Sequence, residues 1–88
     1  MGLIDYEPGI YSTVVKLKWR GQPRDLVEAL AVLDLDGAFK DARSFEVRAG
    51  GDIRIHLTVE SGKTFKDFST RQANWQMMLD LLYEKKAA

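Results

Sequence analysis

Basic side chains occupy even-numbered positions along two stretches of this sequence in which polar and apolar residues alternate. Residues two apart on a β-strand lie on the same face, so such side chains can form one cationic surface. A surface of this kind binds acidic protein segments or the phosphates of a nucleic acid. The candidate partner-binding residues of this type are Lys16, Lys18, Arg20, Arg48, Arg54 and His56.

His56 is the only histidine in the chain, and the sequence contains no cysteine. A zinc site takes three or four protein ligands, and a histidine that acts as a general base needs an orienting acid and a pocket. Glu46 is the carboxylate expected near His56, diagonally across an open sheet surface. Gly50 and Gly51 do not lead into a helix, so they belong to a turn and not to a phosphate-binding loop. The sequence therefore predicts no catalytic residue, no metal site, no cofactor and no enzymatic activity.

The composition is that of one small neutral domain. The chain has 88 residues, of which 45% are apolar, and 13 Lys and Arg balance 13 Asp and Glu. We expect a single domain over 1–88, with a lead-in over 1–9 and a frayed tail over 85–88. No apolar run approaches the roughly 20 residues of a membrane span, and the first residues lack a signal-peptide pattern. These features predict a cytoplasmic protein without a membrane partner.

Residues 11–20 alternate between an apolar and a polar face, which predicts a β-strand. Pro23 suits the first position of a helix, and apolar residues then recur at helical spacing over 24–35. The apolar face of this helix is predicted to contain Leu26, Val27, Leu30 and Leu33. The segment from Ala29 to Leu35 also alternates, so a strand is the competing interpretation. Strong helix formers favour the helix, which a turn over 34–37 would end.

Odd-numbered apolar residues, interrupted by two glycine-containing breaks, predict a three-stranded antiparallel meander over 45–65. Facing residues of an antiparallel pair share a face, so the loop length decides which side chains are buried together. A three-residue loop over 49–51 places Gly51 in the left-handed position of a type I turn with a bulge. The pairs expected from this loop are Phe45–Ile55, Val47–Ile53, Ser44–His56, Glu46–Arg54 and Arg48–Asp52.

The same parity predicts a second hairpin loop over 60–62, which pairs Leu57 with Phe65. A capping-box pattern over 69–72 then predicts the start of the last helix. The apolar stripe of that helix, expected to pack on the odd-numbered face, consists of Trp75, Met78, Leu79 and Leu82. Apolar side chains also lie beside this stripe, and their excess predicts an edge for a partner or for self-association. The residues of this second candidate surface are Met77, Leu81 and Tyr83.

These elements predict an α+β fold in the order β-α-β-β-β-α. Its antiparallel sheet combines the three-stranded meander with the N-terminal strand, and the helices pack on one face. We expect a small regulator, adaptor or inhibitor that binds another protein through the polar sheet face or the edge of the last helix. The alternative is a nucleic-acid-binding domain that uses the Lys and Arg residues of the sheet, although zero net charge disfavours it. A purely structural interpretation is a solvated sheet face whose basic row over 16–20 guards an edge strand.

Overall fold

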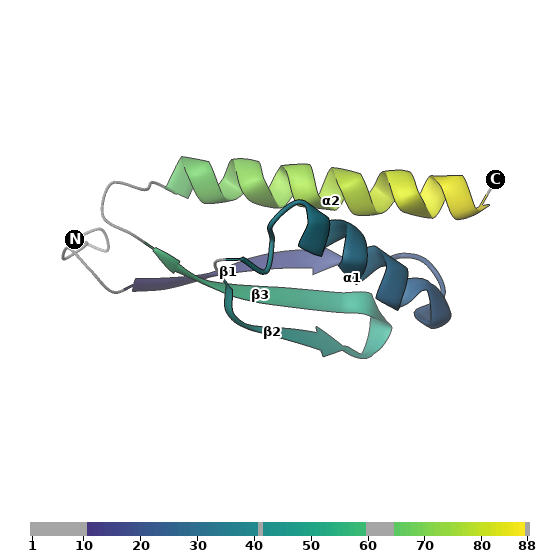
Figure 1. The fold of residues 1–88 in the computed structure, drawn as a ribbon, viewed down its shortest axis with the longest axis horizontal. Helices are drawn as coiled ribbons and strands as arrows, with labels where there is room; N and C mark the ends of the chain where they lie inside the picture. The colour runs from purple at the N-terminus through teal and green to yellow at the C-terminus, as the bar shows by residue number, and fades with distance from the viewer. Residues whose placement is uncertain (1–10, 41, 60–64, 88) are drawn as a thin grey trace.

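The computed structural model describes residues 11–40, 42–59 and 65–87. They form a three-stranded antiparallel sheet and two α-helices, with two short 3-10 turns (Figure 1). The elements in chain order are β1 (Tyr11–Lys18), η1 (Pro23–Asp25), α1 (Leu26–Leu35), β2 (Ala42–Arg48), η2 (Ala49–Gly51), β3 (Asp52–Val59) and α2 (Phe65–Ala87). The predicted α+β class is confirmed, and the helical interpretation of residues after Pro23 is correct.

Strand β3 lies at the centre of the sheet, whose order is β1-β3-β2. Both neighbours run antiparallel to it, and Ile55 lies opposite Val15 of β1 and Phe45 of β2. The five predicted pairs of the β2–β3 hairpin are all confirmed as register partners. A register shift between Ala42 and Ser44 interrupts β2 near its start. Beyond that shift, the odd-numbered residues of all three strands share one side of the sheet.

The β2–β3 hairpin turns through Ala49–Gly51, as the parity of the sequence predicts. Gly51 has a φ of +85°, which is the left-handed conformation expected for it. Gly50 also has a positive φ, +83°, so the predicted type I turn is wrong. A type I turn needs a φ of about −90° at that position. The turn packs against the chain that follows β1, where the Trp19 N–H donates a hydrogen bond of 2.8 Å to the Gly51 carbonyl.

The core lies between the odd-numbered side of β1 and β3 and the two helices. Its buried side chains are Val15, Leu17, Trp19, Ala29, Leu33, Ala38, Ile53, Ile55, Leu57, Phe68, Trp75 and Leu79. Helix α1 buries Ala29 and Leu33, whereas Val27, predicted to be in the core, is 78% exposed. Strand β2 contributes less than predicted, because Phe45 and Val47 remain 49% and 40% exposed.

The predicted third strand of the meander, which would have been the fourth strand of the sheet, is wrong, since Phe65 begins helix α2. Leu57 lies opposite Thr13 of β1 and Ala42 of β2, and not opposite Phe65. The physical reason is that β1 pairs with β3 along the edge that a third meander strand would need. The loop predicted over 60–62 lies outside the described residues.

Helix α2 begins before the predicted capping box, so Ser69 lies inside the helix. Gln72, predicted to close the helix start, instead accepts a hydrogen bond of 2.9 Å from the Lys16 N–H of β1. The helix continues to Ala87, past the predicted start of fraying, and Lys86 Nζ lies 2.7 Å from Glu28 Oε2 of α1. In the described part of the chain, neither helix combines the length and apolar content that crossing a membrane requires.

Replacing Gly51 with alanine should destabilise the fold more than replacing Gly50. Both residues have a positive φ, so each alanine variant should lose about 1 kcal/mol through backbone strain. A Cβ at Gly51 would also overlap the Trp19 carbonyl oxygen, whereas a Cβ at Gly50 would meet only the Lys18 Nζ, at 3.7 Å. Chemical denaturation of the two variants measures this difference. Equal losses of unfolding free energy would contradict the close approach of the turn to Trp19.

Candidate partner-binding surface

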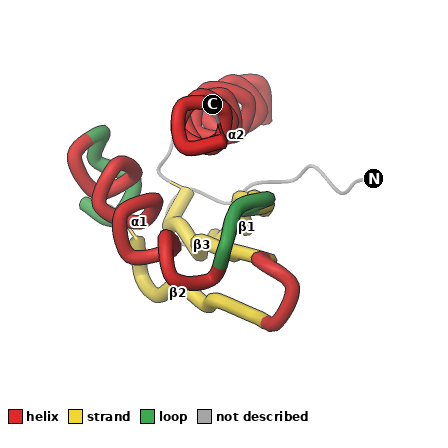
Figure 2. Tube along the Cα trace, turned by 90° about the vertical axis from the view of Figure 1, so that its right-hand side faces the viewer, coloured by secondary structure: helices red, strands yellow, loops and turns green. Residues whose placement is uncertain are grey.

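The even-numbered side of the sheet is a surface that neither helix covers, because both helices pack on the odd-numbered side (Figure 2). The registers align its side chains in three rows across β1, β3 and β2: Val14–His56–Ser44, Lys16–Arg54–Glu46 and Lys18–Asp52–Arg48. These nine residues are termed the open face. Five of the six predicted basic residues therefore share one surface.

Both carboxylates of the open face are engaged by neighbouring bases. Glu46 Oε1 lies 3.1 Å from His56 Nε2, and Glu46 Oε2 lies 3.4 Å from Arg48 Nη2. Asp52 Oδ2 lies 3.7 Å from Arg54 Nη2. Glu46 and Arg54, and likewise Arg48 and Asp52, lie opposite each other as predicted, but the ion pairs join other partners. The contacts run along a strand or diagonally, because same-face neighbours in a sheet are about 7 Å apart and long side chains span that distance.

Glu46 is the electrostatic centre of this cluster. The hydrogen bond with His56, followed by the attraction of Arg48, lowers the pKa of the Glu46 carboxyl below its ordinary value of 4.5. A lowered pKa in the folded state means that Glu46 stabilises the fold above pH 4.5 and loses this effect as the pH falls through the lowered pKa. Near neutral pH the Glu46 carboxylate is ionised and already contacts both His56 and Arg48.

Lys16 and Lys18 differ from the other bases of the open face. Among the described residues, neither ammonium group has a carboxylate within ion-pair distance. The open face therefore carries four permanent cations against two carboxylates, and the two lysines supply the excess positive charge.

The backbone of β1 next to these lysines is closed by helix α2. Gln72 Oε1 accepts from the Lys16 N–H at 2.9 Å, and Gln76 Oε1 accepts from the Lys18 N–H at 2.8 Å. Gln76 Nε2 also donates to the Lys18 carbonyl at 2.9 Å. Glutamine side chains therefore protect this edge, and not the basic row that the sequence suggested. Their four-residue spacing, which places both on one side of a helix, was the signal that could have revealed this.

Arg20 does not belong to the open face, contrary to the prediction. Its Nε lies 3.4 Å from Asp80 Oδ1, and its guanidinium carbon lies 4.6 Å from the centre of the Tyr83 ring. Strand β1 ends at Lys18, so the alternation that predicted the position of Arg20 does not extend that far. Arg20 instead connects the end of β1 to helix α2.

The predicted partner-binding edge of α2 is not one surface. Met77 and Leu81, about one turn apart, are 54% and 59% exposed. Tyr83 is partly buried, and its ring lies edge-on to the Trp19 ring with the centroids 6.3 Å apart. Six residues of helix correspond to about 240° of rotation, which takes Tyr83 away from the side of Met77. Only a small apolar pair remains exposed there.

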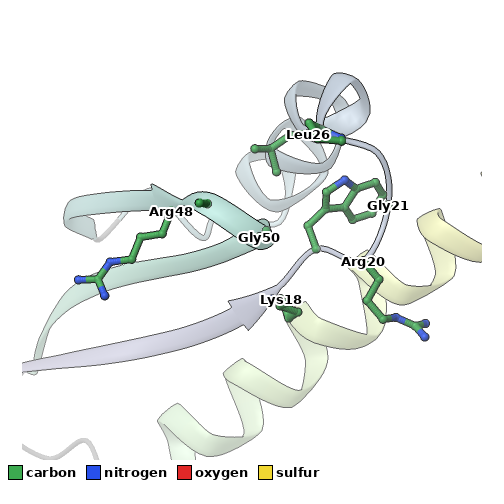
Figure 3. A pocket seen from close by; sticks show the side chains of 10 residues that line it. Lys18, Arg20, Gly21, Leu26, Arg48 and Gly50 are labelled. Carbon is green, nitrogen blue, oxygen red and sulfur yellow. The ribbon is translucent and has the colours of Figure 1, made fainter.

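A pocket of about 430 Å³ lies at the hairpin end of the sheet (Figure 3). It is lined by Lys18, Trp19, Arg20, Gly21, Pro23, Leu26, Arg48, Ala49, Gly50 and Gly51. Arg20 and Arg48 extend away from each other in Figure 3, so their guanidinium groups do not converge on a ligand. The lining contains no carboxylate, histidine or hydroxyl side chain that could act as a general base or nucleophile. No residue pattern in the sequence indicates this pocket, because the pocket depends on the tertiary approach of the turn to Trp19.

Within 11–40, 42–59 and 65–87, no group of three His, Asp or Glu side chains is placed to hold a metal ion. Comparison with known proteins gave no match to a family model, to a curated protein or to a solved structure. The candidate surface therefore rests on the geometry of this chain alone.

Replacing His56 with alanine should raise the pKa of Glu46 toward its ordinary value of 4.5, because the hydrogen bond with His56 is the main cause of its lowering. Replacing Arg43, an exposed base on the same strand, should leave the pKa of Glu46 unchanged. The measurement is an NMR titration of the Glu46 carboxyl carbon in the wild type and both variants. A wild-type pKa at or above 4.5, or no change in the His56→Ala variant, would contradict the role given to this contact.

Proposed function

We propose that this domain is a non-enzymatic protein-binding module whose open face receives an acidic surface of another protein. The observation that carries the proposal is the excess of cations on a sheet face that neither helix covers. Glu46 and Asp52 are already engaged by bases of the same face. Lys16 and Lys18 have no such partner among the described residues, so a carboxylate of another protein would provide the missing charge.

The other residues of the open face support recognition of a partner by the positions of its charges more than by burial of its side chains. Glu46 lies on β2 and Asp52 on the central strand β3, whereas the two lysines without a carboxylate partner among the described residues lie on the edge strand β1. This asymmetry favours a partner whose acidic groups align with β1. Exposed charges of this kind mainly accelerate association and exclude partners of like charge.

The same lysines could follow a line of phosphates, which is the basis of the nucleic-acid alternative. The chain as a whole has no net positive charge, and two carboxylates lie within the same surface. Nucleic-acid-binding domains are usually strongly basic, so these features favour a protein partner. The experiment below separates the two.

Reversing both unpaired lysines, Lys16→Glu with Lys18→Glu, should weaken partner binding roughly tenfold or more, because each reversal replaces an attraction on the order of 1 kcal/mol with a repulsion. The matched control is Lys40→Glu with Lys85→Glu, which makes the same charge change at exposed positions outside the open face. The measurement is affinity capture on the immobilised wild type and both variants, from lysate with and without nuclease treatment, followed by titration of the captured protein.

Proteins retained by the wild type and the control but lost from the Lys16/Lys18 variant would support the proposal. Equal retention by all three forms would contradict it. Retention that depends on intact nucleic acid would favour the alternative function.

A further inference from the structure

The two edges of the sheet are treated differently in this fold. Along β1, the side chains of Gln72 and Gln76 occupy the outward backbone groups of Lys16 and Lys18. A further strand cannot pair there without displacing α2. Strand β2, at the opposite edge, has exposed side chains from its second residue to its last.

The alternation of antiparallel hydrogen bonds identifies which backbone groups of β2 point outward. Successive residues of a strand direct their N–H and C=O groups to opposite sides. In β1 the outward groups belong to even-numbered residues, as the two glutamine contacts show. The odd-numbered residues of β1 therefore bond to β3, and the even-numbered residues of β3 bond to β2. Beyond the register shift between Ala42 and Ser44, this leaves the outward positions of β2 to the odd-numbered residues Phe45 and Val47.

Phe45 and Val47 thus offer two kinds of contact at once. Their backbone groups point out of the sheet, and their side chains are 49% and 40% exposed on the helix side. Phe45 also stacks on Phe39, with ring centroids 4.8 Å apart. An unprotected edge with apolar side chains is a template for pairing with another strand.

The geometry points to antiparallel pairing of β2 with β2 of a second copy of this chain, about a two-fold axis at Phe45. The product is a homodimer with a continuous six-stranded sheet. An antiparallel two-fold arrangement keeps the helices of both copies on the same side. The open faces stay uncovered, so this inference goes beyond the proposed function and does not depend on it.

The charges along β2 favour a second copy of this chain at the β2 edge, and they also favour one alignment of the two β2 strands. A register centred on Phe45 sets Glu46 opposite Ser44 of the second copy, twice by symmetry, so a carboxylate faces a hydroxyl donor. A register centred on Glu46 would place two carboxylates opposite each other, which is unfavourable. A register centred on Val47 would move Phe45 opposite Ala49 in the turn. An acidic segment, the partner class expected for the open face, would bring its carboxylates beside Glu46.

The pairing brings the Phe45 rings of the two copies together beside the Phe39 stack on each side. Cross-strand aromatic pairs of this kind are stabilising. The shift between Ala42 and Ser44 ends the regular part of the strand, so the paired region is short. We therefore expect a dimer that dissociates on dilution.

The first test is the molar mass of the full chain in solution across a range of concentrations. The mass of the wild type should rise from 10.0 kDa toward twice that value as the concentration increases. Val47→Lys should remain a monomer, since its charged side chain lies at the paired edge. Leu81→Lys is the matched control, with an exposed apolar residue of α2 replaced by lysine, and it should dimerise like the wild type.

Circular dichroism checks that both variants are folded. A wild type that stays monomeric at every concentration would overturn the inference. Loss of the dimer in Leu81→Lys but not in Val47→Lys would also overturn it, and would assign self-association to α2.

The second test uses the absence of native cysteines. Facing residues that are not hydrogen-bonded have Cα atoms about 4.5 Å apart, which is within the range of a disulfide. The double variant Ser44→Cys with Glu46→Cys should therefore form covalent dimers on oxidation, with Phe45 and Val47 intact. Glu46→Cys alone should not, because it faces Ser44 of the second copy. Efficient cross-linking by Glu46→Cys alone would overturn the register, and no cross-linking in either variant would overturn the pairing.

Discussion

The packing of helix α2 along β1 is the contact on which the rest of this structure depends. Trp75 and Leu79 are buried in the core, and Gln72 and Gln76 bond to the outer edge of β1. The two residues of each pair are four positions apart, so a helix lying along β1 makes both sets of contacts at once. The Trp75 indole also donates to Asp36 Oδ2 at 2.6 Å, which joins α2 to the end of α1. With the odd-numbered side and the β1 edge occupied in this way, the open face and the edge of β2 are the parts of the sheet that the described residues leave free.

Local patterns in the sequence predicted the parts of the fold that depend on neighbouring residues. Strict alternation and two glycines were sufficient for the register of the β2–β3 hairpin, because a one-residue slip would turn Val47 or Ile53 to the wrong side. The same parity failed beyond Val59, since it cannot indicate that β1 already occupies the other side of β3. The exposure of Val27 was also missed, because α1 packs with a face centred on Ala29 and Leu33. Which helix face meets the core is a tertiary choice, and apolar spacing alone left several possible.

For the candidate site, the sequence likewise predicted which residues share a face but not which side chains contact each other. Side-chain parity placed the open-face bases together correctly, but ion pairing follows side-chain reach, so Glu46 contacts His56 and Arg48 and not the residue opposite it. Arg20 and Tyr83 were assigned to partner surfaces and instead contact each other. Arg20 lies beyond the end of β1, where strand alternation no longer determines the side to which a residue points. Tyr83 lies on a different side of α2 from Met77, although the two are close in the sequence. The functional proposal therefore rests on residues within regular strands, where geometry and charge agree.

Amide hydrogen exchange in dilute solution tests the central claim most directly, which is that α2 closes one edge of the sheet and leaves the other open. The N–H groups of Lys16 and Lys18 should exchange slowly, because Gln72 and Gln76 accept their hydrogen bonds. The outward N–H groups of Phe45 and Val47 should exchange much faster in the monomer, because no described residue accepts a hydrogen bond from them. Fast exchange at Lys16 and Lys18 together with slow exchange at Phe45 and Val47 would contradict the account, because the edge of β1 would then be open and the edge of β2 closed.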